Sequence, residues 1–256
     1  MSIAIVTGAS SGLGSEFTQQ ISEKYEIEEI WVIARRRERL EELEHLVKTP
    51  LRILCYDLTQ KESIREIQDL LEEQHPDVKL LVNAAGFGKI GSWKDISLED
   101  CENMIDLNCR AAVSMTQIVL PYMTKGSQII EVASTAGFQS FQFLNVYASS
   151  KSFLYRYSRA LRVELLTSGI HVTALCPYWI KDTEFIGISQ ETDSQTYVRH
   201  FPLSQKKKHV VSMALRDSNL NLAVSTPGIV CTVHRIAAKI IPSELMMGIW
   251  ALLRRV

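Results

Sequence analysis

Short apolar runs alternate with longer polar segments along most of the chain. The apolar runs are expected to be strands, and they are Ile3–Thr7, Glu29–Ala34, Leu51–Tyr56, Lys79–Asn83, Ser127–Ala133 and His171–Cys176. The segments between them have the length and the 3.6-residue period of helices. The expected helices are Glu16–Tyr25, Glu38–Val47, Ser63–Gln74, Leu98–Met123 and Tyr147–Thr167.

This alternation predicts the fold class. Strands that are apolar throughout, each followed by a helix, are typical of a parallel sheet that is covered on both faces. We therefore expect an α/β protein with a doubly wound, mostly parallel sheet, which is a Rossmann fold arranged as a three-layer α/β/α sandwich. Ligands of such sheets bind at the carboxyl ends of the strands. Because no repeat or linker interrupts the pattern, residues 1–256 are expected to form a single domain.

Two stretches depart from the alternation. Residues 181–211 are polar and aperiodic, and they follow the sixth strand, where a lid over a substrate is expected. Residues 205–256 carry eight basic and two acidic side chains, a net charge of +6, which leaves −7 on the first 204 residues. We expect this basic segment to pack on the domain, over the pocket or a subunit interface. The alternative is that Pro242–Leu253 forms an amphipathic helix on a membrane surface.

Composition and charge exclude several classes of protein. Hydrophobic residues make up 46% and charged residues 22% of the 256, as in soluble globular proteins. The net charge of −1 argues against a dedicated nucleic-acid binder, which would normally be basic. The five cysteines are too far apart for a zinc or redox motif, so no metal site is predicted. Without a signal peptide or an apolar run of roughly 20 residues, the protein is expected to be cytoplasmic.

A glycine-rich turn, TGASSGLG at residues 7–14, follows the first strand and opens the first helix. Glycines let the backbone turn tightly and approach a pyrophosphate, whose charge the helix N-terminus stabilises. At the first strand of an alternating sheet, this turn predicts a dinucleotide site. The predicted contacts in it are Gly8, Ser10, Ser11, Gly12, Leu13 and Gly14.

Tyr147 and Lys151 are four residues apart, so a helix places both side chains on one face. An isolated tyrosine has a pKa near 10 and is a poor acid–base group at neutral pH. A nearby ammonium lowers that pKa toward the range in which proton transfer is efficient. Ser134, 13 residues upstream of Tyr147, supplies a hydroxyl that can hydrogen-bond a substrate carbonyl or alcohol. The three residues predict a proton-transfer site.

Together these motifs resemble the short-chain dehydrogenase/reductase family over nearly the whole chain. The family has the TGxxxGxG spacing of residues 7–14, an NNAG turn similar to Asn83-Ala84-Ala85-Gly86, and a YxxxK pair matching Tyr147 and Lys151. Ser134 stands where the family has its catalytic serine. The resemblance implies a nicotinamide-dependent oxidoreductase that forms a homodimer or homotetramer.

The resemblance also implies a role for each matching residue. Tyr147 would be the general acid/base, and Ser134 would polarise the substrate. Lys151 would lower the pKa of Tyr147 and hold the nicotinamide ribose, while Asn108 would support a water linked to Lys151. Further cofactor contacts are implied for Asp57, Leu58, Asn83, Ala84, Ala85, Tyr147, Lys151, Pro177 and Ile180.

The cofactor type depends on the end of the second strand, where three arginines follow Ala34. NAD enzymes usually have an acidic residue here, whereas arginine can bind the 2′-phosphate of NADP bidentately. We expect NADP(H), with Arg35 as the main contact and Arg36 as the second. The alternative is a solvated helix start, in which these arginines pair with Glu38, Glu41 and Glu42.

One segment departs from the family pattern. After the sixth strand the family usually reads Pro-Gly and then a short stretch ending in Thr. This chain has Tyr178 after Pro177, and one more residue before Thr183. The change puts a nicotinamide contact of Thr183 in question, and the bulk of Tyr178 narrows the expected substrate pocket.

The remaining clues concern the substrate. Residues near the expected catalytic centre are largely apolar, and the predicted substrate contacts are Phe138, Phe141, Leu144 and Tyr178. We therefore expect an NADP(H)-dependent oxidoreductase that interconverts a ketone and a secondary alcohol, with a lipophilic substrate that is steroid-like or acyl. The alternatives are a 3-oxoacyl carrier-protein reductase and a nucleotide-binding regulator without turnover.

Overall fold

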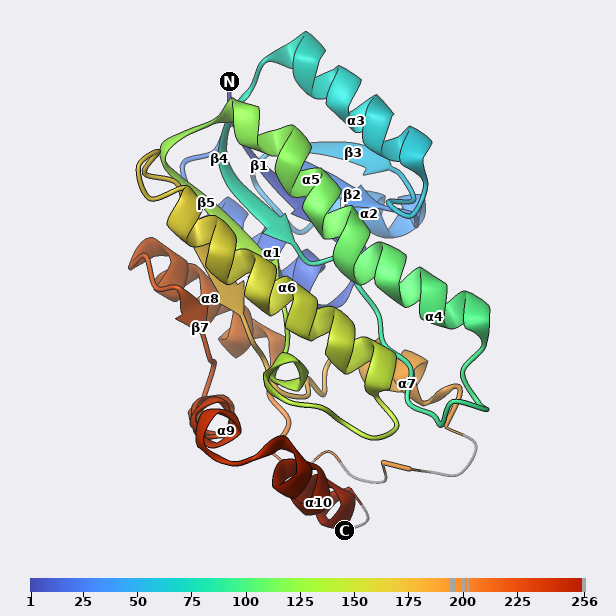
Figure 1. Ribbon diagram of the computed structural model, residues 1–256. Coiled ribbons are helices and arrows are strands. Elements are labelled where there is room, and N and C mark those ends of the chain that lie inside the picture. Colours follow the sequence, from blue (N-terminus) through green and yellow to red (C-terminus); the bar gives the residue numbers. More distant parts are fainter. Residues whose placement is uncertain (194–196, 199–200, 202, 255–256) are drawn as a thin grey trace.

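A computed structural model describes residues 1–193, 197–198, 201 and 203–254 of the chain. Its centre is a seven-stranded sheet in the order β3-β2-β1-β4-β5-β6-β7, and all neighbouring strands are parallel (Figure 1). The predicted doubly wound fold is confirmed. The strands are β1 Ser2–Thr7, β2 Glu29–Ala34, β3 Leu51–Cys55, β4 Asp77–Asn83, β5 Met123–Val132, β6 His171–Leu175 and β7 Val224–Ser225.

Helices cover both faces of the sheet (Figure 1). One hydrophobic core joins the sheet to α1, α2 and α8, and a second core joins it to α3, α5 and α6. Alternate residues of β1 enter opposite cores, because successive side chains of a strand point to opposite faces. The helices are α1 Gly12–Lys24, α2 Arg37–Glu44, α3 Lys61–Gln74, α4 Leu98–Ile105, α5 Ala112–Val119, α6 Asn145–Glu164, α7 Phe185–Gln190, α8 Lys207–Asn219, α9 Ile229–Ile240 and α10 Ser243–Leu253.

The single helix expected over residues 98–123 is interrupted. A π-helical turn, Asp106–Ala111, separates α4 from α5, and a 3-10 turn, Leu120–Tyr122, follows α5. Pro121 lies in that turn, where its missing N–H ends the helix, and β5 begins at once at Met123. Single π-helical turns inside α-helices are frequent at functional sites.

The two irregular stretches also differ from expectation. The predicted lid over 181–211 contains α7, but its last part is already α8, which packs beside α1. The strand β7 was not predicted because only two residues form it. Helices α9 and α10 lie beyond the carboxyl edge of the sheet (Figure 1). Six lid residues (194–196, 199–200 and 202) and residues 255–256 of the basic segment lie outside the described residues.

No helix in the described part of the chain combines the length and the apolar character needed to span a membrane.

Candidate active site

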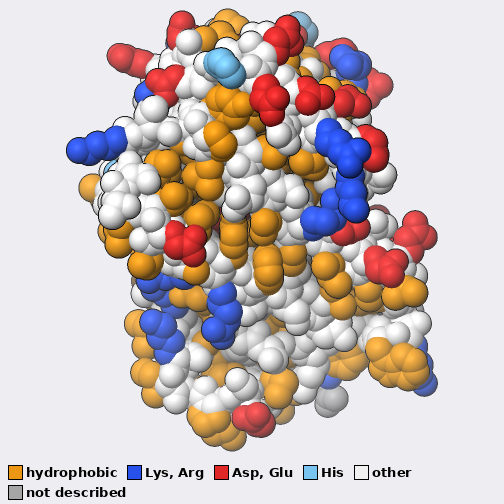
Figure 2. Space-filling model, turned by 45° about the horizontal axis from the view of Figure 1, so that its top comes forward, with side chains coloured by type: hydrophobic (Ala, Val, Ile, Leu, Met, Phe, Trp, Pro, Cys, Tyr) orange, Lys and Arg blue, Asp and Glu red, His pale blue; other side chains and the backbone are white. Residues whose placement is uncertain are grey.

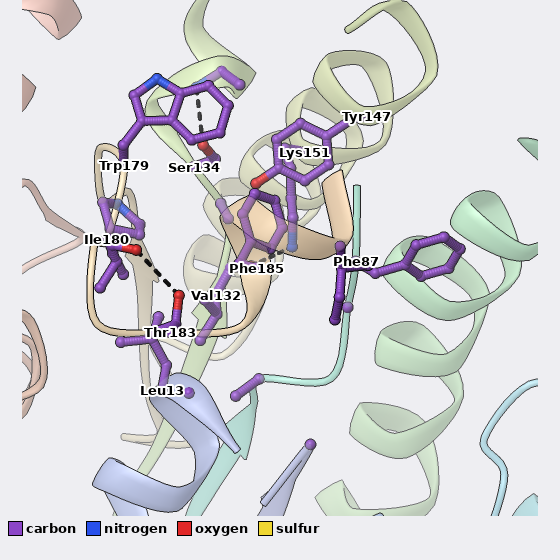
Figure 3. Close-up of a pocket in the computed structure, with 18 of the residues that line it drawn as sticks. Leu13, Phe87, Val132, Ser134, Tyr147, Lys151, Trp179, Ile180, Thr183 and Phe185 are labelled. Carbon is purple, nitrogen blue, oxygen red and sulfur yellow. Dashed lines mark hydrogen bonds between the residues drawn. The ribbon is translucent and has the colours of Figure 1, made fainter. Parts of the chain in front are cut away.

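A cavity of about 1400 Å³ opens at the carboxyl edge of the sheet, where ligands of doubly wound sheets bind. It extends from the glycine-rich turn to α9 and α10, and Figure 3 shows part of its lining. Most of the predicted site residues meet in it. Those that line it are Gly8, Ser10, Ser11, Gly12, Leu13, Gly14, Arg35, Arg36, Asp57, Leu58, Ala84, Ala85, Ser134, Phe141, Leu144, Tyr147, Lys151, Pro177, Tyr178 and Ile180.

The glycine-rich turn has the shape of a phosphate cradle. Gly8 has φ +67°, a conformation that favours glycine, and a Cβ on Gly14 would lie 2.2 Å from the Gly8 carbonyl oxygen. Thr7 Oγ1 accepts hydrogen bonds from the Ala84 and Ala85 amides, each at 3.1 Å, so the turn is tied to the strand-end turn after β4. The residues present therefore fit a dinucleotide at the N-terminus of α1.

Arg35 and Arg36 form the connection between β2 and α2, and both line the cavity. Arg36 donates to Ser10 Oγ from Nε at 3.4 Å and from Nη2 at 3.3 Å, and its Nη2 lies 2.9 Å from Glu184 Oε2. Arg35 Nη1 lies 3.7 Å from Asp57 Oδ2, with 72% of its side chain exposed. Of the three arginines, Arg37 does pair with Glu41, as the alternative expected, while Glu42 pairs with Arg39. Arg35 and Arg36 thus lie at the end of the cavity that the glycine-rich turn also lines, which we call the nucleotide end.

Tyr147 and Lys151 project from α6 toward Ser134 at the end of β5 (Figure 3). Ser134 Oγ accepts a hydrogen bond from the Ala136 amide at 3.1 Å, which fixes the hydroxyl at the start of a 3-10 turn. Lys151 Nζ donates to the Val132 carbonyl at 2.8 Å and lies 5.9 Å from the centre of the Tyr147 ring. All three side chains are buried around one wall of the cavity.

Burial controls the ionisation of this pair. Loss of solvation raises the pKa of Tyr147 to about 12, although a hydrogen bond with Ser134 lowers it in part. Loss of solvation also lowers the pKa of Lys151 to about 8. The expected lowering of the Tyr147 pKa is therefore wrong for this structure. Desolvation of the phenolate outweighs an ammonium that is bonded to Val132 rather than to the phenol oxygen.

Asn108 lies in the π-helical turn and holds the loop after β4. Its Nδ2 donates to the Phe87 carbonyl at 2.9 Å and to Ser150 Oγ at 3.0 Å, and its Oδ1 accepts from the Phe87 amide at 3.0 Å. A Cβ on Gly86 would lie 2.7 Å from Asn108 Oδ1 and 3.3 Å from Lys151 Nζ. Only glycine fits between the two side chains. Asn108 is fully buried and does not line the cavity.

Two further predicted contacts lie outside the cavity lining. Asn83 is buried beneath the site, where its Nδ2 donates to Thr116 Oγ1 at 2.9 Å and to Glu131 Oε1 at 3.0 Å. Phe138 packs edge-on against Tyr155, with ring centres 5.3 Å apart. In both cases the side chain turns toward a partner that the sequence did not indicate.

Thr183, for which the altered segment after β6 left the contact open, does line the cavity. Its hydroxyl donates to the Ile180 carbonyl at 3.1 Å (Figure 3). A Cβ on Gly12 would lie 3.7 Å from Thr183 Cβ, so Thr183 lies directly beside the start of α1.

Among the cavity residues that were not identified from the sequence are Lys89, Glu184 and Trp250. Lys89 is buried, and its Nζ lies 2.5 Å from Glu191 Oε2. Trp250 reaches back from α10 and packs edge-on against Phe141, with ring centres 5.0 Å apart. Lys89 follows the NAAG turn by three residues, and Trp250 lies in the segment expected over the pocket or an interface, but no pattern indicated Glu184.

Comparisons with known proteins agree with this geometry. A family model described as short chain dehydrogenase matches residues 2–193. The NADP-dependent 3-hydroxy acid dehydrogenase YdfG of Escherichia coli (strain K12) is 33% identical over 195 residues, which are 75% of this chain and 77% of that protein.

Solved structures give the same result for the fold. A short-chain dehydrogenase from Sphingobium yanoikuyae in complex with NADPH has a TM-score of 0.79, covering 97% of this chain and 94% of that chain at 23% identity. A closed form of serine dehydrogenase complexed with NADP+ has a TM-score of 0.74, covering 87% and 93% at 29% identity. With its family model, its site and these relatives in agreement, the chain belongs to the short-chain dehydrogenase/reductase family and is an NAD(P)-dependent oxidoreductase.

Proposed function

We propose that this protein uses NADPH to reduce a lipophilic ketone to a secondary alcohol. One observation carries the proposal: the Ser134, Tyr147 and Lys151 side chains share a single cavity with a phosphate-cradling turn and two arginines at the end of β2. The nucleotide end of the cavity is polar and basic, and its other end is aromatic and aliphatic. The retained catalytic set argues against a regulator without turnover.

The cofactor is NADP(H), because Arg35 and Arg36 face the cavity where the 2′-phosphate of the adenosine ribose is expected. Arginine binds such a phosphate through charge-assisted hydrogen bonds. The turn at residues 7–14 would hold the pyrophosphate, Asp57 and Leu58 the adenine, and Lys151 the nicotinamide ribose. The bound cofactor supplies a hydride for the carbonyl carbon.

The side chains of this protein supply the proton that the carbonyl oxygen takes up and stabilise the charge that develops there. Tyr147 is protonated at neutral pH, and it can donate its proton because an alkoxide developing on that oxygen is a stronger base than the phenolate. The Ser134 hydroxyl, fixed by the Ala136 amide, stabilises the same charge by hydrogen bonding. Lys151 holds a positive charge behind Tyr147, and Asn108 positions the loop after β4 next to Lys151.

The apolar end of the cavity favours a lipophilic substrate. Phe141, Leu144, Tyr178, Trp179 and Trp250 line it, so a bulky apolar group can be desolvated there.

A second candidate is a substrate that carries an acidic group. Lys89 is a buried ammonium in the wall of the cavity, and its partner Glu191 has an exposed side chain that can be replaced by a substrate carboxylate. The E. coli relative is named a 3-hydroxy acid dehydrogenase. A lipophilic oxo acid, including a 3-oxoacyl compound, would use both the aromatic wall and Lys89.

We further propose a homodimer in the cytoplasm. Helices α4 and α6 lie side by side and expose Leu98, Ile105 and Phe153, which suits a subunit contact. Figure 2 views this side of the molecule and shows hydrophobic side chains gathered across its middle. The five cysteines are all free thiols, which suits a reducing compartment.

The decisive experiment is NADPH oxidation with steroid ketones, 3-oxoacyl esters, oxo acids and small aliphatic ketones. We expect turnover with at least one lipophilic ketone and a higher kcat/KM than for small aliphatic ketones. Lys89→Met should raise KM for oxo acids and leave neutral ketones unaffected. An absence of turnover with every carbonyl, despite NADPH binding, would contradict the proposed reaction.

A further inference from the structure

The outer face of α9 carries an unbroken stripe of exposed apolar side chains. Ile229, Val233, Ile236 and Ile240 are between 53% and 83% exposed. They are spaced by four, three and four residues, which places them on one side of a helix. Cys231, on the opposite side, is fully buried against the domain. The stripe is therefore a continuous surface rather than a scatter of single residues.

Helix α10 repeats this arrangement. Leu245, Ile249 and Leu252 are between 45% and 71% exposed, at spacings of four and three residues. Met246 and Trp250, on the inner side, are buried, and the Trp250 indole donates to the Gln142 carbonyl at 3.3 Å. The helix thus packs on the domain through its inner side, while its outer face stays apolar.

We call these seven side chains on α9 and α10 the apolar rim, because they continue into the cavity. Ile229, Val233 and Ile249 of the rim also line the cavity wall. Ile188 and Leu203, both exposed, line it from other segments. Exposed apolar surface of this extent usually marks an interaction site. Here the apolar rim lies around the entrance to the lipophilic end of the cavity.

The charges around the rim favour an anionic partner. Arg235 and Lys239 lie on one flank of α9, and the sequence has no acidic residue between Asp217 and Glu244. The whole segment from residue 205 carries a net charge of +6. A second copy docking through the same face would bring two basic segments together, which like-charge repulsion opposes. The apolar face on α4 and α6 is separate and remains available for a subunit contact.

We propose that the apolar rim docks on the surface of an anionic lipid bilayer, without spanning it. An apolar helix face flanked by basic residues binds at the boundary between headgroups and acyl chains, and anionic lipids strengthen the binding. The mouth of the cavity then faces the bilayer, so a lipophilic ketone can enter from the lipid. The docking itself stands on the rim, and only this route of entry rests on the proposed function.

The test is flotation of the purified protein with phosphatidylcholine vesicles, prepared with and without phosphatidylglycerol. Ile236 and Ile240 belong to the rim but do not line the cavity, so the variant Ile236→Gln/Ile240→Gln leaves the site intact. We expect it to bind anionic vesicles at least about tenfold more weakly than the wild type. Lys239→Gln should weaken binding to anionic vesicles about fivefold. The matched control is Val163→Gln/Leu166→Gln, two exposed apolar residues, one in the last turn of α6 and one just after its end.

The outcomes separate the possible partners. Vesicle binding that is lost in the rim variant and kept in the control supports the proposal. Absent vesicle binding, or equal binding by rim variant and control, overturns it. If the rim variant instead changes the mass measured by light scattering, the rim is a contact between copies of this chain, which also overturns it. Turnover of a water-soluble ketone without vesicles is measured in parallel, so a failed reaction is distinguished from failed docking.

Discussion

Arg36 and Glu184 form an ion pair across the nucleotide end of the cavity, with 2.9 Å between Nη2 and Oε2. The pair joins the end of β2 to the residue that precedes α7. The same guanidinium contacts Ser10 Oγ in the glycine-rich turn. A carboxylate therefore occupies one side of the arginine that we expect to bind the 2′-phosphate, and it lies close enough to influence cofactor selection.

Glu184→Gln should raise the affinity for NADPH and leave that for NADH nearly unchanged. The substitution removes both a competitor for Arg36 and a negative charge near the phosphate. Because the two side chains are 45% and 42% exposed, the gain should be about two- to fivefold. Fluorescence titration with both cofactors measures it. Glu191→Gln, at the substrate end, is the control, and equal changes for both cofactors would contradict the assignment.

Replacing both arginines should reverse the cofactor preference. A charge-assisted hydrogen bond contributes roughly 1.5–3 kcal/mol, so Arg35→Asp/Arg36→Asp should lower NADPH affinity by at least about tenfold. NADH lacks the phosphate and should be much less affected. Arg37→Asp is the matched control, since Arg37 pairs with Glu41 on α2. If the ratio of the two dissociation constants is unchanged in the double variant, Arg35 and Arg36 do not select NADP(H).

Tyr147→Phe should lower kcat by about 10²–10⁴-fold, because the ring is kept and only the proton donor is lost. NADPH binding should survive. Tyr155→Phe, two turns later on α6, removes a hydroxyl outside the cavity and should retain nearly full activity. Steady-state kinetics together with cofactor titration separate the two effects. A Tyr147 variant with most of its activity would exclude Tyr147 as the acid.

Glu131 should make stability depend on pH. It is fully buried beneath the site, and burial raises its pKa from 4.5 to about 7, against hydrogen bonds from Asn83 and Thr116 that lower it. The folded protein thus holds a proton that the unfolded chain loses. The stabilisation is complete below pH 4.5 and is lost as pH rises through about 7, a change of about 3 kcal/mol.

Glu131→Gln removes this titration. Urea unfolding between pH 4.5 and 7.5 should show the free energy of unfolding of the wild type falling relative to that of the variant. Parallel curves for the two proteins would mean that Glu131 has an ordinary pKa in the folded state.

Trp250→Ala should lower the free energy of unfolding by about 3 kcal/mol. The substitution leaves a void against Phe141 and removes the hydrogen bond to the Gln142 carbonyl. Leu252→Ala, on the exposed side of α10, is the control and should change stability by no more than about 0.5 kcal/mol. If both variants unfold like the wild type, α10 does not contribute to the stability of the domain.

The sequence alone determined the sheet and the order of its motifs. Strands buried on both faces must be apolar throughout, so the six long strands were predicted at or near their observed bounds. The glycine-rich turn and the Tyr147–Lys151 pair are likewise local features. Their geometry follows from backbone sterics and the helical period, which act over a few residues.

Only the tertiary structure decided where individual side chains turn and how they ionise. It pairs Arg36 with Glu184 and Lys151 with the Val132 carbonyl, and it turns Asn83 away from the cavity toward Glu131. It also raises the pKa of Tyr147 instead of lowering it. The physical reason is that hydrogen-bond partners and desolvation are set by residues far away in the chain. A sequence pattern shows which side chains are present, but the packed interior determines which of them meet and which lose their water.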